Sequence, residues 1–196
     1  MATSLHQQLK ASYAEKLQGA EEIALGDYRV DVAFPGGVVE IQHASLASIR
    51  KKTRELLEDH HVVIVKPLIF RRKLIKYAKK DGAVVGSRFS PKRGCWLDVF
   101  EDLIYLRDVF PHERLTIELP AVEIEEHRYP KKKPRFRKAN YHISNQVLTR
   151  LIETRVLESR ADIVKLLPTP LPGEFDTGDL SDLWGVSRWL CQRITY

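Results

Sequence analysis

The sequence has few cysteines and no Cys/His cluster at the spacing of a zinc site. Its two cysteines, Cys95 and Cys191, lie far apart in the 196 residues. We therefore expect free thiols in a reducing compartment rather than a disulfide framework. A glycine-rich phosphate loop and a nucleophile elbow are also missing from the sequence, which argues against an ATPase, a zinc enzyme and a serine hydrolase.

Long apolar runs are absent too. No stretch of the sequence is apolar over enough residues to span a bilayer, and the N-terminus has no apolar signal-peptide core. We therefore expect a cytoplasmic protein with no membrane partner.

Acidic residues are in the minority: 26 Asp and Glu stand against 32 Lys and Arg, a formal net charge of +6. This balance suits a polyanion such as nucleic acid, and it suits plain solubility equally well. The hydrophobic content of 43% is that of a globular protein, so we expect a buried core. The composition leaves the oligomeric state open, a homodimer included.

Two short β-prone stretches flank a Pro-Gly-Gly turn at residues 35–37. Residues 28–34 and residues 38–42 both alternate between apolar and polar side chains, and both contain acids. The pattern predicts a β-hairpin with acids on one of its faces.

The register of this hairpin depends on which pair of residues makes the turn. A Pro-Gly turn places Asp31 directly opposite Glu40, whereas a Gly-Gly turn places Asp31 opposite Gln42. In either register the three side chains share one face. Facing carboxylates repel each other, and the chemistry that suits them is a divalent cation, Mg²⁺ or Mn²⁺, held by oxygen ligands. The alternative is a pair of solvated acids, each bound to a nearby Lys or Arg.

Asp31 on one strand, followed by Glu40-Ile41-Gln42 on the next strand and then by a helix, resembles the PD-(D/E)XK nuclease superfamily. There an Asp precedes an acid-x-Lys sequence. Gln42 stands where Lys is usual, which is similar to the E-x-Q variant of competence-protein-type nucleases. Ser45 at the start of the next helix resembles that variant as well.

The resemblance implies a role for each residue of the motif. Asp31, Glu40 and the backbone carbonyl of Ile41 would hold Mg²⁺ or Mn²⁺, and Gln42 would orient the attacking water or the phosphate. The resolvase-like branch of the superfamily draws a further acid from the first helix, for which Glu15 is the candidate here.

Lys52 lies one or two turns into the helix predicted after the hairpin. A lysine there is within reach of the site, or it is a solvated residue on the surface of the helix.

The order of the predicted elements favours an α/β or α+β fold. Helices are expected over residues 5–22 and 45–59, and strands over residues 61–69 and 115–124. With the hairpin these would form a mixed-sheet, restriction-endonuclease-like core within a domain spanning residues 1–128.

A basic segment with two prolines follows this domain. Residues 129–143 are interpreted as a linker or arm, since prolines disfavour a helix. Its candidate DNA-binding residues are Lys131, Lys132, Lys133, Arg135 and Arg137. Beyond it, residues 144–196 are expected to be helical, beginning with a helix over residues 144–167.

The last twenty residues, 177–196, resemble a helix-turn-helix. Thr177 would cap the first helix, Gly185 would make the turn and Ser187 would cap the second helix. In such motifs the early residues of the second helix face the major groove. Here these are Arg188, Trp189, Gln192 and Arg193.

Together these patterns predict a metal-dependent nuclease that hydrolyses phosphodiester bonds of DNA. Two alternatives stay open: a catalytically inactive DNA-binding protein with the nuclease fold, and a helix-turn-helix transcriptional regulator. Metal binding at Asp31 and Glu40 separates the first hypothesis from the other two.

Overall fold

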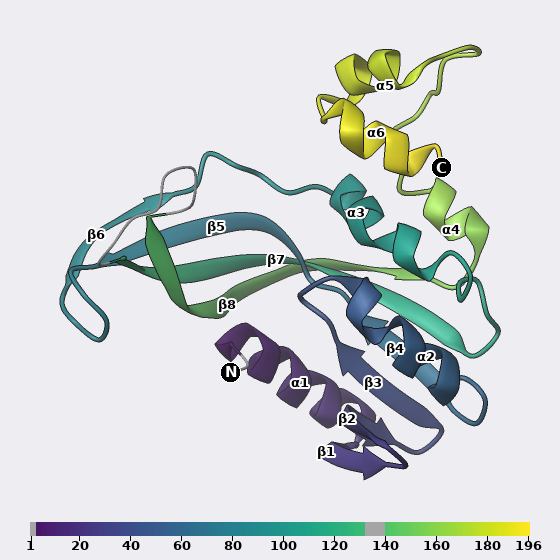
Figure 1. Cartoon of the computed structure of the whole chain (residues 1–196), viewed down its shortest axis with the longest axis horizontal. Coiled ribbons are helices and arrows are strands. Elements are labelled where there is room, and N and C mark those ends of the chain that lie inside the picture. The colour runs from purple at the N-terminus through teal and green to yellow at the C-terminus, as the bar shows by residue number, and fades with distance from the viewer. Residues whose placement is uncertain (1–2, 132–139) are drawn as a thin grey trace.

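A computed structural model describes residues 3–131 and 140–196. The described residues form a mixed eight-stranded sheet flanked by helices (Figure 1), which is an α+β fold as expected. The strand order is β1-β2-β3-β4-β7-β5-β6, and β8 pairs with β7.

The N-terminal half builds the part of the sheet that contains the hairpin. β1, β2 and β3 are antiparallel neighbours, and β4 pairs with β3 in parallel after a helical crossover. The elements in chain order are α1 (Ser4–Leu17), β1 (Ala20–Leu25), β2 (Tyr28–Phe34), β3 (Gly37–Ile41), the 3-10 turn η1 (Leu46–Ile49), α2 (Arg50–Leu56) and β4 (His61–Val65).

The turn between β2 and β3 is made by Pro35 and Gly36, because Phe34 is paired with Gly37. The first of the two registers considered above is therefore correct. Ser45 caps the following helical segment, its side chain accepting a hydrogen bond from the N–H of Ala47, which confirms the predicted helix start.

The expected helix over residues 5–22 was too long. α1 ends at Leu17, where Gln18 adopts a left-handed conformation. Gly19 then passes so close to β2 that a Cβ atom would lie 2.7 Å from the carbonyl oxygen of Ala33. Residues 20–22 consequently belong to β1, because pairing with β2 outweighs their helical preference.

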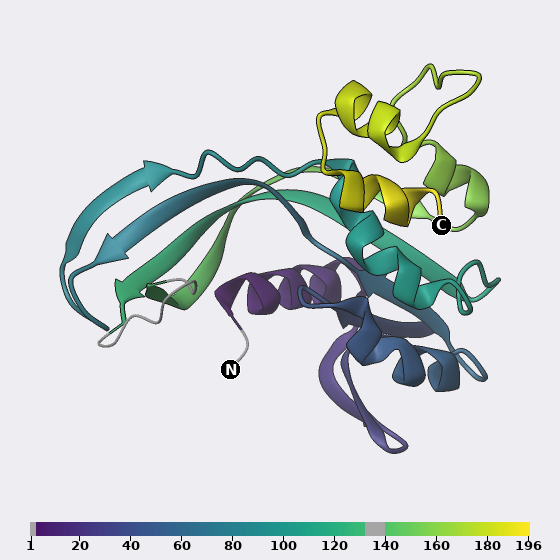
Figure 2. The same ribbon diagram turned by 45° about the horizontal axis from the view of Figure 1, so that its top comes forward.

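The second half of the chain extends the sheet into a long curved arm (Figures 1 and 2). We define the arm as β5, β6 and the paired residues 122–130 and 141–151 of β7 and β8. Its strands are β5 (Leu68–Tyr77), β6 (Val84–Phe89), β7 (Leu115–Pro130) and β8 (Tyr141–Leu157). β7 lies inside the sheet between β8 and the strands β4 and β5.

The helix predicted over residues 144–167 is wrong: most of this segment is β8, a strand of 17 residues paired with β7. The pairing shifts register at three places, which leaves Ser144, Thr149 and Ile152 without a partner on β7. Each bulge interrupts the alternation of side chains between the two faces. The apolar residues of β8 therefore recur at three- and four-residue intervals that resemble a helix.

The expected linker is also partly strand. Tyr129 and Pro130 end β7, Tyr141 begins β8, and the expected domain boundary at residue 128 falls inside β7. The N–H of Lys131 donates to the carbonyl of Asn140. The other four candidate DNA-binding residues of this segment, Lys132, Lys133, Arg135 and Arg137, lie outside the described residues.

The predicted helix-turn-helix is present as two short helices. α5 (Thr177–Trp184) ends at Gly185 in a left-handed conformation, and Ser187 caps α6 (Arg188–Ile194). The cap of α5 is Asp176 rather than Thr177. The other described helical segments of the second half are η2 (Trp96–Val99), α3 (Phe100–Leu103), η3 (Ile104–Leu106) and α4 (Arg160–Val164). No described helix is both long and apolar enough to cross a membrane.

The hydrophobic core has two parts, one on each face of the sheet. α1 buries Leu5 and Leu9 against Val39 and Ile124 on one face. On the other face the helices η1 to η3 pack against strand residues such as Ile64. The hairpin is thus held between two helical layers.

The close approach of β3 to β4 yields a first prediction. A Cβ atom on Gly37 would lie 2.4 Å from the carbonyl oxygen of His61. Gly37→Ala should therefore lower the free energy of unfolding by about 1–3 kcal/mol, the usual cost of overpacking, as measured by urea denaturation. Gly86→Ala is the matched control, because no atom lies within 4 Å of that position. Equal stabilities of the two variants would contradict the prediction.

Candidate active site

Asp31 lies where the pairing of β2 with β3 ends. The last paired residues are Val32 and Val39, and beyond them Oδ2 of Asp31 accepts a hydrogen bond of 2.8 Å from the N–H of Ile41. The carboxylate thus takes the place of a backbone carbonyl between the strands. Glu40 is the next residue of β3, so the two acids are neighbours across the hairpin, as predicted.

The imidazole of His6 on α1 binds Asp31 from the other side. Nε2 of His6 lies 3.3 Å from Oδ1 of Asp31. Burial alone would raise the pKa of Asp31, but the hydrogen bonds from His6 and Ile41 outweigh burial and hold it below its usual value. The pKa of His6 is raised, chiefly by its hydrogen bond to Asp31. Asp31 is therefore a carboxylate that is available to a cation at neutral pH.

Glu40 is almost completely buried and is paired with Lys52. Its side chain is 7% exposed, and Nζ of Lys52 lies 2.5 Å from Oε1. Lys52 also donates to the carbonyl of Arg29 over 2.6 Å. Although the ammonium is close enough for an ion pair, it is not aligned for a hydrogen bond, and Oε1 accepts none in the described structure. Burial raises the pKa of Glu40 and the charge of Lys52 opposes that rise.

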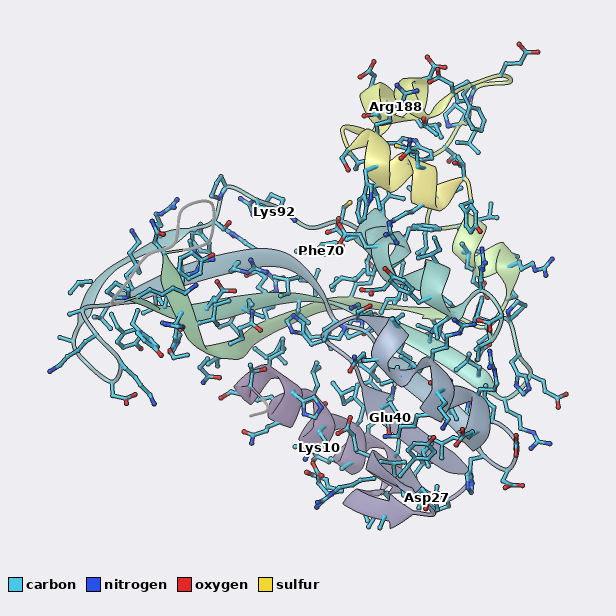
Figure 3. All side chains as sticks on the ribbon, in the orientation of Figure 1. Lys10, Asp27, Glu40, Phe70, Lys92 and Arg188 are labelled. Atoms are coloured by element: carbon cyan, nitrogen blue, oxygen red, sulfur yellow. The ribbon has the colours of Figure 1, made fainter. Side chains whose placement is uncertain are left out.

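Lys52 therefore reaches the site and is not simply a solvated residue on the surface of its helix. Lys52 belongs to α2, and this helix lies on the face of the sheet where Lys52 meets Glu40. Figure 3 shows Glu40 between this helix and α1, which carries Lys10. Lys10 itself contacts Glu21 and Glu22 of β1 rather than Asp31 or Glu40.

Gln42 and Glu15 do not join the two acids. Nε2 of Gln42 donates to the carbonyl of Ser45 at 2.8 Å and to Oγ of Ser48 at 2.7 Å, so its amide braces the turn into α2. Glu15 is exposed on α1. Nine residues separate it from His6, which at 3.6 residues per turn places it on the opposite face of the helix. The positive charge beside the acids thus comes from Lys52.

The donor set fits a divalent cation that keeps part of its water shell. In the described part of the chain no three His, Cys, Asp or Glu side chains converge on a complete metal site. Mg²⁺, however, is commonly held by one or two carboxylates with water and substrate phosphate. Asp31 and Glu40 provide two such carboxylates, and Lys52 already holds a positive charge 2.5 Å from Oε1 of Glu40.

The predicted groove-facing residues of α6 divide into two groups. Arg188, Trp189 and Gln192 are exposed, and Arg188 donates to Oγ1 of Thr177. Arg193 instead donates to the carbonyl of Glu101 and lies 4.2 Å from the centre of the Trp189 ring. Arg193 therefore helps to attach α6 to α3.

Sequence reasoning missed a polar cavity beyond the ends of β3 and β4. The cavity has a volume of about 240 Å³, and its lining includes His43, Lys66, Arg72 and Asp102. Nζ of Lys66 lies 2.7 Å from Oδ2 of Asp102. Burial, together with the charges of Lys66 and Arg72, lowers the pKa of His43. A lysine directly after the apolar strand was the available signal, since a buried lysine needs a partner.

The Lys52–Glu40 pair yields a second prediction. Lys52→Ala should lower the free energy of unfolding at pH 7 by about 3 kcal/mol, because it leaves a buried carboxylate without its cation. Removing the ammonium would raise the pKa of Glu40 further. The deficit should therefore shrink as the pH falls and Glu40 takes up a proton.

The adjacent Lys51 provides the control, since it is 84% exposed and pairs with Glu55 on the surface. Lys51→Ala should change the stability by less than about 0.5 kcal/mol. Denaturant titrations of both variants at several pH values measure the difference. Equal stabilities at pH 7 would show that the Lys52 ammonium does not compensate the Glu40 charge.

The sequence of this chain matches a protein-family model. A family model described as "Domain of unknown function (DUF8091)" matches residues 3–158, from α1 to the end of β8. An uncharacterized protein of Treponema pallidum (strain Nichols) is 28% identical over 180 residues, which are 91% of this chain and 71% of that protein. No solved structure matches the chain. Because the family model covers most of its length, the chain belongs to the DUF8091 family.

Proposed function

We propose that this protein is a metal-dependent nuclease that hydrolyses phosphodiester bonds of DNA. The carrying observation is the grouping of two neighbouring carboxylates, Asp31 and Glu40, with the ammonium of Lys52 2.5 Å from Glu40. Acids on adjacent strands with a lysine beside them suit a reaction in which a water attacks a phosphate. The proposal includes the cytoplasmic location that we expect from the sequence.

Each side chain has a role that follows from its contacts. Asp31, kept ionised by His6 and the N–H of Ile41, and Glu40 would hold Mg²⁺ or Mn²⁺ together with the carbonyl of Ile41. When bound, such an ion lowers the pKa of water and offsets the negative charge that develops on the phosphate. Lys52 supplies a point charge to the phosphate or to the attacking water.

The arrangement of elements supports the same proposal. A helix, a hairpin with an acid on each strand, a crossover helix and a parallel buried strand follow one another as α1, β2, β3, α2 and β4. This is the order that the resemblance to the PD-(D/E)XK superfamily implies. Lys52 on α2 offers the cation that Gln42 on β3 cannot supply.

Cleavage of labelled single-stranded, duplex and branched DNA with Mg²⁺ or Mn²⁺ tests the proposal. Asp31→Asn and Glu40→Gln should abolish cleavage, because each removes a metal ligand. Lys52→Ala should slow cleavage by about 100-fold, the usual loss when one charge that stabilises the transition state is removed. Circular dichroism would show whether each variant is folded under the assay conditions.

The matched control is Asp27→Asn, an exposed acid in the turn between β1 and β2 (Figure 3). This variant should cleave DNA at the rate of the wild type. DNA binding without cleavage, unchanged in the Asp31 and Glu40 variants, would reject the nuclease function. It would favour the catalytically inactive DNA-binding alternative.

A second candidate function is sequence-specific DNA binding by α5 and α6, as in a transcriptional regulator. The observation that favours it is the left-handed Gly185 between two capped helices, with Arg188 and Trp189 exposed at the start of the second helix. Early residues of such a helix are the ones that contact base edges.

Arg188→Ala tests this second candidate. The variant should weaken binding to a preferred DNA sequence by about 1–3 kcal/mol and relax the preference, because a base contact is lost. Arg193→Ala should act mainly through stability, since Arg193 binds the carbonyl of Glu101. Fluorescence anisotropy and thermal denaturation separate the two effects. Unchanged affinity in Arg188→Ala would mean that α5 and α6 only pack against α3.

A further inference from the structure

Unpaired positive charge collects on the arm. Residues 70–94 contain nine Lys and Arg residues and a single acid, Asp81. Six of the basic residues are exposed and have no ion-pair partner in the described structure: Lys76, Lys79, Lys80, Arg88, Lys92 and Arg93. Cations elsewhere, such as Arg50 and Arg54 with Asp108, are largely neutralised. Several unpaired cations close together indicate that this part of the surface binds an anionic partner.

The strand register places two of these cations on one face of the arm. Leu74 is paired with Arg88 on β6 and with Glu126 on β7. Side chains two residues apart on a strand share a face, so Lys76 lies on the same face as Arg88 and Glu126. Glu126 itself is buried and bound by Arg72 and Arg128. That face therefore carries four basic residues, Arg72, Lys76, Arg88 and Arg128, around one acid.

The same face leads to the candidate active site. Ile124 lies two residues before Glu126 and packs with Leu5 and Leu9 of α1. α1 also carries His6, which binds Asp31. Figures 1 and 2 show α1 against the sheet below the curve of the arm. The basic face of the arm and the Asp31 site are thus joined through one helix.

The aromatic residues of the arm do not form a platform for unpaired bases. Single-stranded nucleic acid is usually bound by stacking of its bases on exposed rings. The aromatic rings described on the arm already contact a protein partner: Phe89 lies against Arg71, Tyr141 against Arg128, Tyr129 against His142, Tyr77 against His127 and Phe70 against Trp96. Phe89, opposite Lys73, also lies on the other face. The cations of the arm therefore suit the phosphates of a duplex.

We propose that the face of the arm formed by Arg72, Lys76, Arg88 and Arg128, with Lys79 and Lys80 at its tip, binds the backbone of duplex DNA and leads it to the Asp31–Glu40 site. This assignment rests on the proposed nuclease function for its last step. From Arg72 to Lys76 the face spans about 13 Å at a strand's rise per residue. Phosphates of one DNA strand follow one another about every 3.4 Å along the helix axis, so this length matches about four of them.

The experiment measures duplex binding by fluorescence anisotropy in EDTA, where metal-dependent cleavage cannot occur. Two variants remove two charges each from the arm, Lys76→Ala with Arg88→Ala, and Lys79→Ala with Lys80→Ala. All four side chains are exposed and unpaired, so the fold should be retained. The control is Lys51→Ala with Lys165→Ala, which removes two exposed charges that pair with acids on their own helices.

Both arm variants should bind duplex DNA at least about tenfold more weakly than the control, with little dependence on DNA sequence. The slope of log K against log salt concentration should become shallower by about 1.8, which corresponds to two lost phosphate contacts. A single-stranded competitor should displace the duplex poorly. Wild-type affinity in the arm variants, an unchanged salt slope, or preferential binding of single strands would overturn the assignment.

Failure of this inference and failure of the nuclease function give different results. If the wild type cleaves DNA but the arm variants keep their affinity, the nuclease function stands and the binding surface is wrong. If the arm variants lose affinity but no metal-dependent cleavage occurs, the duplex-binding surface stands and the nuclease function is wrong.

Discussion

The site depends on the point where β2 and β3 stop pairing with each other. Because the ladder ends at Val32 and Val39, a carboxylate oxygen of Asp31 replaces the next backbone acceptor and binds the N–H of Ile41. This contact sets Asp31 beside Glu40 and leaves both acids between the helical layers. His6 from α1 and Lys52 from α2 then reach one acid each. Moving either helix would leave a largely buried carboxylate without the side chain that pairs with it.

The local parts of this arrangement were predictable from the sequence because short-range rules determine them. A Pro-Gly turn sets the register of the hairpin, and Ser45 caps the helix that carries Lys52. Sequence spacing alone could not decide whether Lys52 points to the site or to solvent. Glu15 shows the opposite case: the helix was predicted, but its rotation about its axis depends on packing of Leu5 and Leu9 against the sheet.

The sequence was misleading where tertiary pairing determines local structure. Residues 144–157 have apolar spacing that fits a helix, yet β7 provides a strand partner for all of them except the three bulged residues. The preference of a segment for helix or strand is weaker than such pairing. The polar cavity lined by His43 and Lys66 was equally hard to foresee, because its walls come from the segments that follow β3 and β4, from β5 and from α3, which are far apart in the chain.

The bulges of β8 have a consequence for association between molecules. Among the described strands β7 alone pairs with β8, so the outer edge of this strand of 17 residues has no strand partner, although the side chain of Gln8 binds the N–H and the carbonyl of Leu148. Leu151 and Ile152 are exposed on this edge strand, a combination that would normally invite a second strand to add to the sheet. Three irregularities in its ladder disrupt the even row of donors and acceptors that an incoming strand requires. The irregular strand thus makes it less favourable for a second strand to add to this edge.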